Sequence, residues 1–191
     1  MKKTKPRLYI LPGWGQRVSD ENYQKIISLA SRYEFTPLRV STRNRRFSLG
    51  SSASFKRIVQ DIGKQIARPC HRDVILGFSV GALQAYQLAT SIKFGKVLIC
   101  SISTMLGSDL SSVPKNCMPD LSWSQYREMT AMKYTPLVNK KVIILYGENE
   151  SSILKSRSMK IGKRLGCKVI KIKRANHVMN SLYIDALRRF L

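Results

Sequence analysis

Two hydrophobic patterns alternate along the chain. Short apolar runs, such as RLYIL and DVILGF, contain almost no polar positions and predict strands that are covered on both faces of a sheet. Between them, apolar residues recur with the spacing of a helix that buries one face. The predicted strands are 7–11, 34–40, 73–78, 96–102, 141–147 and 168–173. The predicted helices follow Asp20, cover the apolar positions from Phe55 to Ile66, and span 80–92, 153–166 and 181–191.

Strands that alternate with helices predict an α/β fold with a mostly parallel sheet between two helical layers. Pro37 suggests that the second strand lies at an edge, because proline cannot donate a ladder hydrogen bond. Residues 105–136 interrupt the alternation with three prolines and a tryptophan, and we interpret them as an insertion. We therefore expect a single domain over 1–191. In such sheets, ligands bind beyond the carboxyl ends of the strands, so the loops that follow the strands are the ones to inspect.

The composition is that of an ordinary globular chain, with 43% hydrophobic and 24% charged residues. No apolar run approaches the ~20 residues that span a bilayer. The apolar stretch LYIL after the basic N-terminus is too short for a signal peptide, so we expect a cytoplasmic protein. The few cysteines and histidines form no ligand pattern, which predicts neither a disulfide framework nor a metal or cofactor site. The cysteines are Cys70, Cys100, Cys117 and Cys167, and the histidines are His71 and His177.

The charge is strongly basic, with 34 Lys and Arg against 11 Asp and Glu and a net charge of +23. Residues 151–184 contain no acidic residue, and Arg39, Arg43, Arg45 and Arg46 form a second basic cluster. Such a field attracts acidic partners, namely nucleic acid, an anionic lipid or an acidic carrier protein. A solvated basic surface without a partner is the alternative. Aromatic residues are not interleaved with the basic runs, which disfavours single-stranded nucleic acid.

The loop after the third strand reads GFSVG, residues 77–81, and places Ser79 between two glycines. An apolar strand comes directly before it and an alanine-rich helix directly after it. This context is typical of a serine nucleophile held on a strained turn, where the helix N-terminus favours developing negative charge. A tight strand-to-helix turn without catalytic chemistry is the alternative interpretation.

A serine nucleophile needs a base and a carboxylate that orients the base. His177 follows the last strand, whereas His71 precedes the GFSVG strand and would lie at the opposite end of the sheet. The loop after the fifth strand, YGENE, offers Glu148 and Glu150, although acidic residues at a helix N-terminus are also common for the helix dipole alone. The oxyanion needs two N–H donors. Val80 and the loop LPGWG, with Trp14, are the candidates.

This order of loops, LPGWG, GFSVG, YGENE and RANHV, resembles the α/β-hydrolase superfamily over residues 8–191. The resemblance implies Ser79 as nucleophile, Glu150 as acid, His177 as base, and Trp14 and Val80 as oxyanion donors. It also implies a parallel sheet of order 2-1-3-4-5-6 that lacks the first two strands of the full fold, with a short lid over 105–136.

Besides the short lid over 105–136, which would leave the pocket shallow or open, the chain departs from the family pattern at two places. The family acid is usually Asp in a GxxD sequence, whereas this chain has Glu150 in GENE, so Glu148 and Asp109 stay open as alternative acids. The oxyanion loop usually begins with His-Gly, and here Pro12 replaces the histidine. That change removes a side chain but leaves the backbone donor in place.

The Gly-Trp-Gly loop, the GxSxG turn and the small lid are also similar to the pimeloyl-acyl-carrier-protein methyl ester carboxylesterases of biotin biosynthesis. This similarity implies a substrate tethered to an acidic carrier protein. We thus expect a serine hydrolase that cleaves a carboxylic ester or thioester through an acyl-enzyme on Ser79, without a cofactor. The alternative is a non-catalytic protein of the same fold that binds nucleic acid or another acidic partner through its basic surface.

Overall fold

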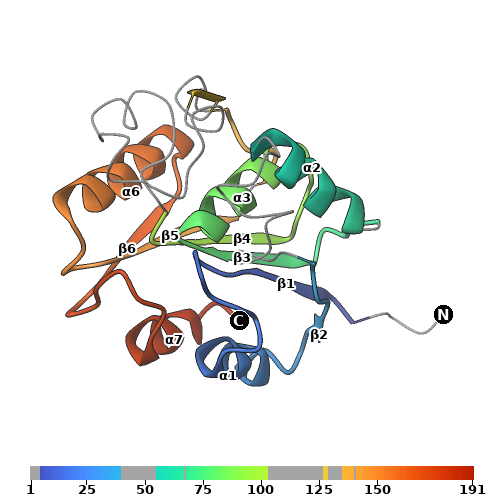
Figure 1. Cartoon of the computed structure of the whole chain (residues 1–191), viewed down its shortest axis with the longest axis horizontal. Helices are drawn as coiled ribbons and strands as arrows, with labels where there is room; N and C mark the ends of the chain where they lie inside the picture. Colours follow the sequence, from blue (N-terminus) through green and yellow to red (C-terminus); the bar gives the residue numbers. More distant parts are fainter. Residues whose placement is uncertain (1–4, 40–54, 67, 103–126, 129–134, 140) are drawn as a thin grey trace.

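The computed structural model describes residues 5–39, 55–66, 68–102, 127–128, 135–139 and 141–191 (Figure 1). They form a six-stranded sheet in which every neighbouring pair is parallel and the order is β2-β1-β3-β4-β5-β6. This order and the α/β class confirm the prediction from the sequence. The strands are β1 (Arg7–Leu11), β2 (Glu34–Phe35), β3 (Val74–Phe78), β4 (Lys96–Cys100), β5 (Val142–Gly147) and β6 (Lys168–Ile172).

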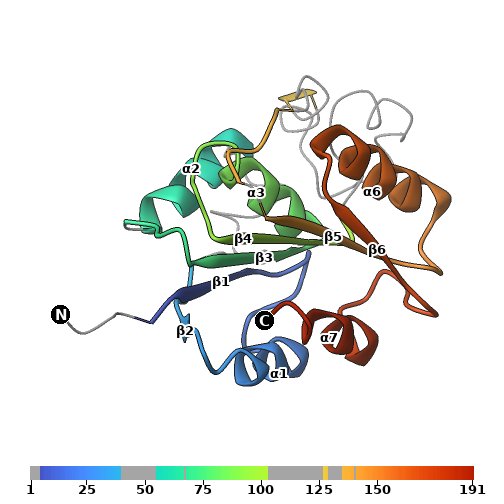
Figure 2. The same cartoon turned by 180° about the vertical axis from the view of Figure 1, so that it is seen from behind.

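Helices cover both faces of the sheet. One face carries α2 (Phe55–Gln65), α3 (Val80–Leu88) and α6 (Ser152–Leu165), and the other carries α1 (Glu21–Leu29) and α7 (Ser181–Leu187), as Figures 1 and 2 show. Side chains alternate between two hydrophobic clusters along each central strand. In β1, Tyr9 and Leu11 join the cluster beneath α2, α3 and α6, whereas Leu8 and Ile10 join the cluster beneath α1 and α7. Burial on both faces explains why the strands read as unbroken apolar runs.

Several elements are shorter than predicted. The second strand ends at Phe35 rather than at residue 40, and the Thr36 amide, which donates to the Leu8 carbonyl at 3.0 Å, makes its last ladder contact with β1 among the described residues. The fourth strand ends at Cys100 rather than at residue 102, because Ser101 turns the backbone to a positive φ of 51°. The last helix ends at Leu187, and the chain closes in tighter turns in which the Phe190 amide donates to the Leu187 carbonyl.

The predicted lid, 105–136, lies almost entirely outside the described residues. Its described part includes Arg127 and Glu128, which are helical. The Glu128 carboxylate accepts hydrogen bonds of 2.8 Å from the Phe55 and Lys56 amides, at the beginning of α2. A carboxylate at this position satisfies the free amides of a helix N-terminus and complements its dipole. Within the described chain, no helix is long and apolar enough to cross a membrane.

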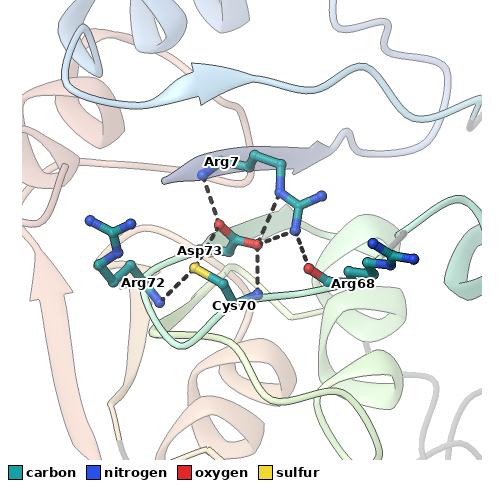
Figure 3. Close-up of polar contacts among 5 residues, drawn as sticks. All are labelled: Arg7, Arg68, Cys70, Arg72 and Asp73. Atoms are coloured by element: carbon teal, nitrogen blue, oxygen red, sulfur yellow. Dashed lines mark hydrogen bonds and ion pairs between the residues drawn. The ribbon is translucent and has the colours of Figure 1, made fainter. Parts of the chain in front are cut away.

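A cluster of polar contacts joins β1 to the turn before β3 at the amino-terminal edge of the sheet (Figure 3). The buried Asp73 carboxylate accepts from the Arg7 amide at 2.8 Å, from the Arg7 guanidinium at 2.8 Å and 3.1 Å, and from the Cys70 amide at 2.9 Å. The Arg7 guanidinium also donates to the Arg68 carbonyl. These contacts lie at the opposite edge from the loops that carry the candidate chemistry.

Candidate active site

The candidate triad residues follow three strands at the carboxyl edge of the sheet. Ser79 follows β3, Glu150 follows β5 and His177 follows β6. The register aligns these strand ends, since Phe78 pairs with Cys100 and Cys100 pairs with Leu145. The parallel topology therefore brings together loops that lie far apart in the sequence (Figure 1).

Ser79 occupies a strained turn between β3 and α3. Its φ of 55° and ψ of −116° lie outside the regions that non-glycine residues favour. The turn is so tight that a Cβ on Gly77 would lie 2.3 Å from the Gly81 carbonyl oxygen, which leaves room for glycine alone. The Ser79 amide donates to the Cys100 carbonyl at 2.9 Å, which ties the turn to β4. Ser79 is only 9% exposed, and it stands at the N-terminus of α3.

His177 contacts Ser79 directly. The Nε2 atom of His177 lies 2.9 Å from the Ser79 Oγ atom, within hydrogen-bond reach for a nucleophile and its base. The residue is partly open to solvent, but its ring packs against Phe78 with centroids 5.5 Å apart. Desolvation of the ring lowers the His177 pKa below its usual value of 6.5, and the charge of Glu150 partly opposes that shift. The imidazole is therefore predominantly neutral at about pH 7 and can accept a proton.

Glu150 lies behind the imidazole and is 4% exposed. Its Oε1 atom accepts hydrogen bonds from the Gly147 amide at 3.0 Å, from the Ser101 hydroxyl at 2.6 Å and from the Tyr183 hydroxyl. The other oxygen, Oε2, is buried and has no hydrogen-bond partner in the described chain. Three donors on one oxygen stabilise a buried carboxylate, because charge-assisted hydrogen bonds compensate for lost hydration.

Ser101 lies between His177 and Glu150, and the sequence interpretation missed it. Its Oγ atom is 2.5 Å from the His177 Nδ1 atom and 2.6 Å from the Glu150 Oε1 atom. Ser101 is fully buried, with a φ of 51° that costs a serine about 1–3 kcal/mol. The available signal was its position as the first residue after β4, at the same edge as the other candidates.

Tyr183 is a second residue that sequence reasoning missed. It lies in α7, its hydroxyl donates to Glu150, and its ring packs edge-on against Phe78 at 5.4 Å. Burial and the neighbouring Glu150 charge raise its pKa far above the usual value, so it remains a donor. The sequence showed only an apolar position of the last helix. Its hydroxyl therefore had no signal of its own.

Glu148, one of the two alternative acids, lies away from the Ser79–His177 pair. Glu148 is on the outside of the same loop, where its carboxylate accepts from the Arg174 amide at 3.1 Å and pairs with Lys171 at 3.2 Å. The Arg174 amide and the Lys171 ammonium lower the Glu148 pKa. Asp109 lies outside the described residues. Of the two candidate carboxylates that the structure describes, Glu150 is the one that lies beside the Ser79–His177 pair, and Glu148 is not.

The loop after β1 lies against the nucleophile turn. A Cβ on Gly81 would lie 2.0 Å from the Leu11 carbonyl oxygen and 2.5 Å from that of Pro12. This contact places the segment that carries Trp14 beside the beginning of α3, whose first residue is Val80. The loop is held in place by the Gly13 amide, which donates to Gln16 at 3.1 Å and to Tyr23 at 3.2 Å. The amides at the beginning of a helix have no intrahelical partner, so Val80 can serve as an anion donor.

Within the described residues, no group of three His, Cys, Asp or Glu side chains is placed to hold a metal ion. The chemistry that the site offers is a hydroxyl, an imidazole that can take its proton, and a buried carboxylate behind the imidazole.

Solved structures resemble this fold at low sequence identity. Alpha/beta hydrolase domain-containing protein 10 from mouse matches with a TM-score of 0.77 and 13% identity, over 100% of this chain and 89% of that protein. Est1E from Butyrivibrio proteoclasticus matches with a TM-score of 0.73 and 13% identity, over 98% and 88%. The type II thioesterase BorB from the borrelidin biosynthetic cluster matches with a TM-score of 0.67 and 16% identity, over 97% and 89%. No protein-family model and no curated protein matches the sequence. The chain therefore has the α/β-hydrolase fold, as its loop order predicted.

Proposed function

We propose that the chain is a serine hydrolase that cleaves a carboxylic ester or thioester through an acyl-enzyme on Ser79. The observation that carries the proposal is the 2.9 Å contact between the Ser79 hydroxyl and the His177 imidazole on a strained strand-to-helix turn. The buried Glu150 carboxylate behind the imidazole supports it. Structures of the same fold include an esterase and a thioesterase by their names, which agrees with this reaction class.

The reaction follows from these positions. Ser79 Oγ attacks the acyl carbonyl carbon while His177 Nε2 takes its proton, and the oxygen of the tetrahedral intermediate is held by the amides of Val80 and Trp14. His177 then gives the proton to the leaving alcohol or thiol, and the ester of Ser79 forms. Water attacks this ester with His177 again as base, which releases the acid and restores Ser79.

The experiment is labelling with a fluorophosphonate, followed by intact mass and by hydrolysis of short acyl esters. We expect one adduct on the parent and none on Ser79→Ala, with unchanged melting temperature. Ser28→Ala is the matched control, since Ser28 is an exposed serine of α1 whose hydroxyl donates to the Gln24 carbonyl of its own helix at 3.0 Å. It should label like the parent. A folded parent that takes no label contradicts the proposal.

The finer proposal concerns the group that presents the acyl chain to the site. Lys173 and Arg174 are exposed in the turn after β6, and Lys155 lies near the beginning of α6, so all three stand at the edge that carries His177. Basic residues at this edge favour an acyl group presented by an acidic carrier protein. A carrier-bound pimeloyl methyl ester is the substrate that the sequence resemblance implies, and carrier-bound thioesters are the second class to test.

The non-catalytic alternative rests on the same charge. A folded parent without acylation of Ser79, but with salt-dependent binding to nucleic acid, would favour a binding protein. The 2.9 Å pairing of Ser79 with His177 favours the enzyme, because a binding surface has no need for it.

A further inference from the structure

We propose that Ser101 is a positioning residue that links His177 to Glu150, so that the acid acts on the base through a serine hydroxyl rather than by direct contact. The inference rests on the proposed function, because it assigns a role within the same site. Its basis is geometric. The Ser101 Oγ atom lies within hydrogen-bond distance of both His177 Nδ1 and Glu150 Oε1, at 2.5 Å and 2.6 Å.

The donors and acceptors of this chain admit one arrangement. An ionised carboxylate only accepts, so the single Ser101 hydrogen points to Glu150 Oε1. The lone pair that remains on Ser101 Oγ then accepts from His177, which places the neutral imidazole proton on Nδ1. Nε2 is left with its lone pair facing Ser79, at 2.9 Å. The hydroxyl thus selects the tautomer in which His177 can act as a base.

The reaction requires no proton transfer to Ser101 or to Glu150. When Ser79 loses its proton to Nε2, the imidazole becomes a cation that carries hydrogens on both nitrogens. The hydrogen on Nδ1 stays on the ring and keeps its hydrogen bond to Ser101 Oγ. The Glu150 charge stabilises the cation through the oriented Ser101 hydroxyl. The proton on Nε2 then leaves with the alcohol or thiol.

A purely structural role for Ser101 would be to satisfy the buried Glu150. Oε1, however, already accepts from the Gly147 amide and from Tyr183, so the Ser101 hydroxyl is not needed to pair that atom. The backbone also adopts an unfavourable positive φ at Ser101 while its amide donates to the Leu145 carbonyl at 2.7 Å. This constraint aims the hydroxyl between the two groups, which is how strained residues serve functional sites.

The test compares Ser101→Ala and Ser101→Gly with the parent in ester hydrolysis across pH. We expect kcat to fall about 10²-fold in both variants, with KM changed by less than about twofold, because Ser101 does not touch the substrate. The acidic limb of the kcat/KM profile should move to lower pH, because the imidazolium loses its link to the Glu150 charge. A role limited to packing would lower the amount of active protein and leave the limb in place.

The other titratable groups around this cluster do not interfere. Tyr183 of α7 and Cys100 of β4 are buried, which raises the pKa of both groups far above the tested range. Among the described residues, Glu150 is the charged group that raises the His177 pKa against desolvation, while Lys173 and Arg174, exposed in the same turn, stay unchanged in every variant compared. Glycine adopts a positive φ without strain. Ser101→Gly therefore shows whether a loss of activity in Ser101→Ala comes from backbone strain or from the missing hydroxyl. Arg68→Gly is the matched control at the amino edge, since Arg68 has a φ of 45° and should leave kcat unchanged.

A double-mutant cycle with Glu150→Gln separates a shared role from independent ones. If Ser101 transmits the effect of Glu150, Ser101→Ala should cost less than about threefold in kcat in the Glu150→Gln background. Equal costs in both backgrounds would overturn the inference, and so would an active parent whose Ser101→Ala variant retains full kcat. Either result leaves the proposed function intact.

Nitrogen NMR of the imidazoles tests the inference without hydrolysis. The chain has two histidines, and His71 at the far edge serves as the internal reference. We expect the neutral His177 ring to carry its proton on Nδ1 in the parent, and to shift toward the Nε2 tautomer in Ser101→Ala. An unchanged His177 tautomer would overturn the role of Ser101. A parent that takes no fluorophosphonate but shows the expected tautomer shift would instead count against the hydrolase while supporting the link.

Discussion

At the scale of single residues, the pKa of His177 sets the pH at which the site works. Desolvation lowers this pKa below 6.5, and only the neutral imidazole accepts the Ser79 proton. We therefore predict that kcat/KM is on its plateau at about pH 7 and falls along an acidic limb whose midpoint lies below 6.5. The measurement is hydrolysis of a short ester across pH. A limb centred above 6.5 would show that the Glu150 charge dominates over desolvation.

The two glutamates of the YGENE loop give the second residue-scale prediction. Glu150→Gln should lower kcat by about 10²–10⁴-fold, because it removes the charge that stabilises the imidazolium. Glu148→Gln is the matched control on the outside of the loop, where the carboxylate contacts Lys171 and Arg174, and it should leave kcat within about twofold. Steady-state kinetics on both variants decide the assignment, and the reverse pattern would move the acid to Glu148.

The sequence predicted Ser79 and His177 because each has a local signal, a GxSxG turn and a histidine after the last strand. It left Glu150 and Glu148 unresolved because the two residues share one loop, and only its three-dimensional turn directs one inward and the other outward. Ser101 had no motif. Its role depends on distances to residues 49 and 76 positions away, which no local pattern contains.

At the scale of elements, the approach of α3 to the loop after β1 depends on Gly81. A Cβ there would lie 2.0 Å from the Leu11 carbonyl oxygen, and backbone cannot yield as a side chain can. We predict that Gly81→Ala lowers the free energy of unfolding by about 3 kcal/mol, at the upper end for overpacked sites. Urea denaturation provides the measurement.

Gly63→Ala is the control for this prediction. The added Cβ would meet side-chain methyl groups of Leu88, at 3.3 Å, and of Ile92, at 3.8 Å, and alanine favours the helix. We expect a change of at most about 1 kcal/mol in either direction. Equal losses for the two glycines would show that the contact with Leu11 is not the cause.

The carboxylate of Asp73 ties β1 to the turn before β3 at the other edge of the sheet (Figure 3). Burial alone would raise the Asp73 pKa, but hydrogen bonds from the Arg7 and Cys70 amides and from the Arg7 side chain outweigh it and lower the pKa. A lowered folded-state pKa stabilises the fold above the unfolded-state pKa of about 3.9, and this stability is lost as pH falls through the folded value.

We predict that Asp73→Asn lowers the free energy of unfolding by about 2–3 kcal/mol at neutral pH, because it leaves buried donors with a weaker acceptor. The difference from the parent should vanish in acid, where Asp73 is protonated in both states. Asp61→Asn is the control, since Asp61 pairs with Lys64 in an exposed helix contact and should change stability by less than about 0.5 kcal/mol. A pH-independent loss at Asp73 would contradict the linkage.

The sequence predicted which helices and strands form better than it predicted the residues at which they end. Buried apolar runs predicted β1, β3, β4 and β5 because both faces of the sheet are covered there, whereas the edge strands β2 and β6 are more exposed and gave weaker patterns. The ends depend on single backbone events, such as the positive φ at Ser101 that stops β4. Asp20 illustrates the same limit. It stands at the N-cap of α1 as expected, yet its carboxylate accepts from the Arg17 amide at 2.8 Å rather than from the helix.

At the scale of the whole molecule, the parallel topology separates two kinds of edge. Every strand ends at the edge that carries Ser79, Ser101, Glu150 and His177, and every strand begins at the edge that Asp73 and Arg7 hold together. Contacts at the amino edge, such as that of Asp73 with Arg7, can therefore be altered without touching the catalytic loops. The net charge of +23 belongs to the whole chain. A basic residue can guide a partner to the site only if it lies at the edge that carries His177.

The last prediction uses this separation to test the acidic carrier. Lys173→Glu with Arg174→Glu reverses charge beside His177, whereas Lys93→Glu with Lys141→Glu makes the same change in net charge at the amino edge. The first pair should raise KM for a carrier-bound acyl substrate about tenfold or more and leave kcat/KM for a small free ester unchanged, because a charged rim steers the carrier and not the reaction. The second pair should leave both substrates nearly unaffected. Added salt should raise the parent's KM for the carrier-bound substrate as well, since it screens the same attraction. Equal effects of the two pairs would mean that the field of the whole molecule, and not a docking face, attracts the partner.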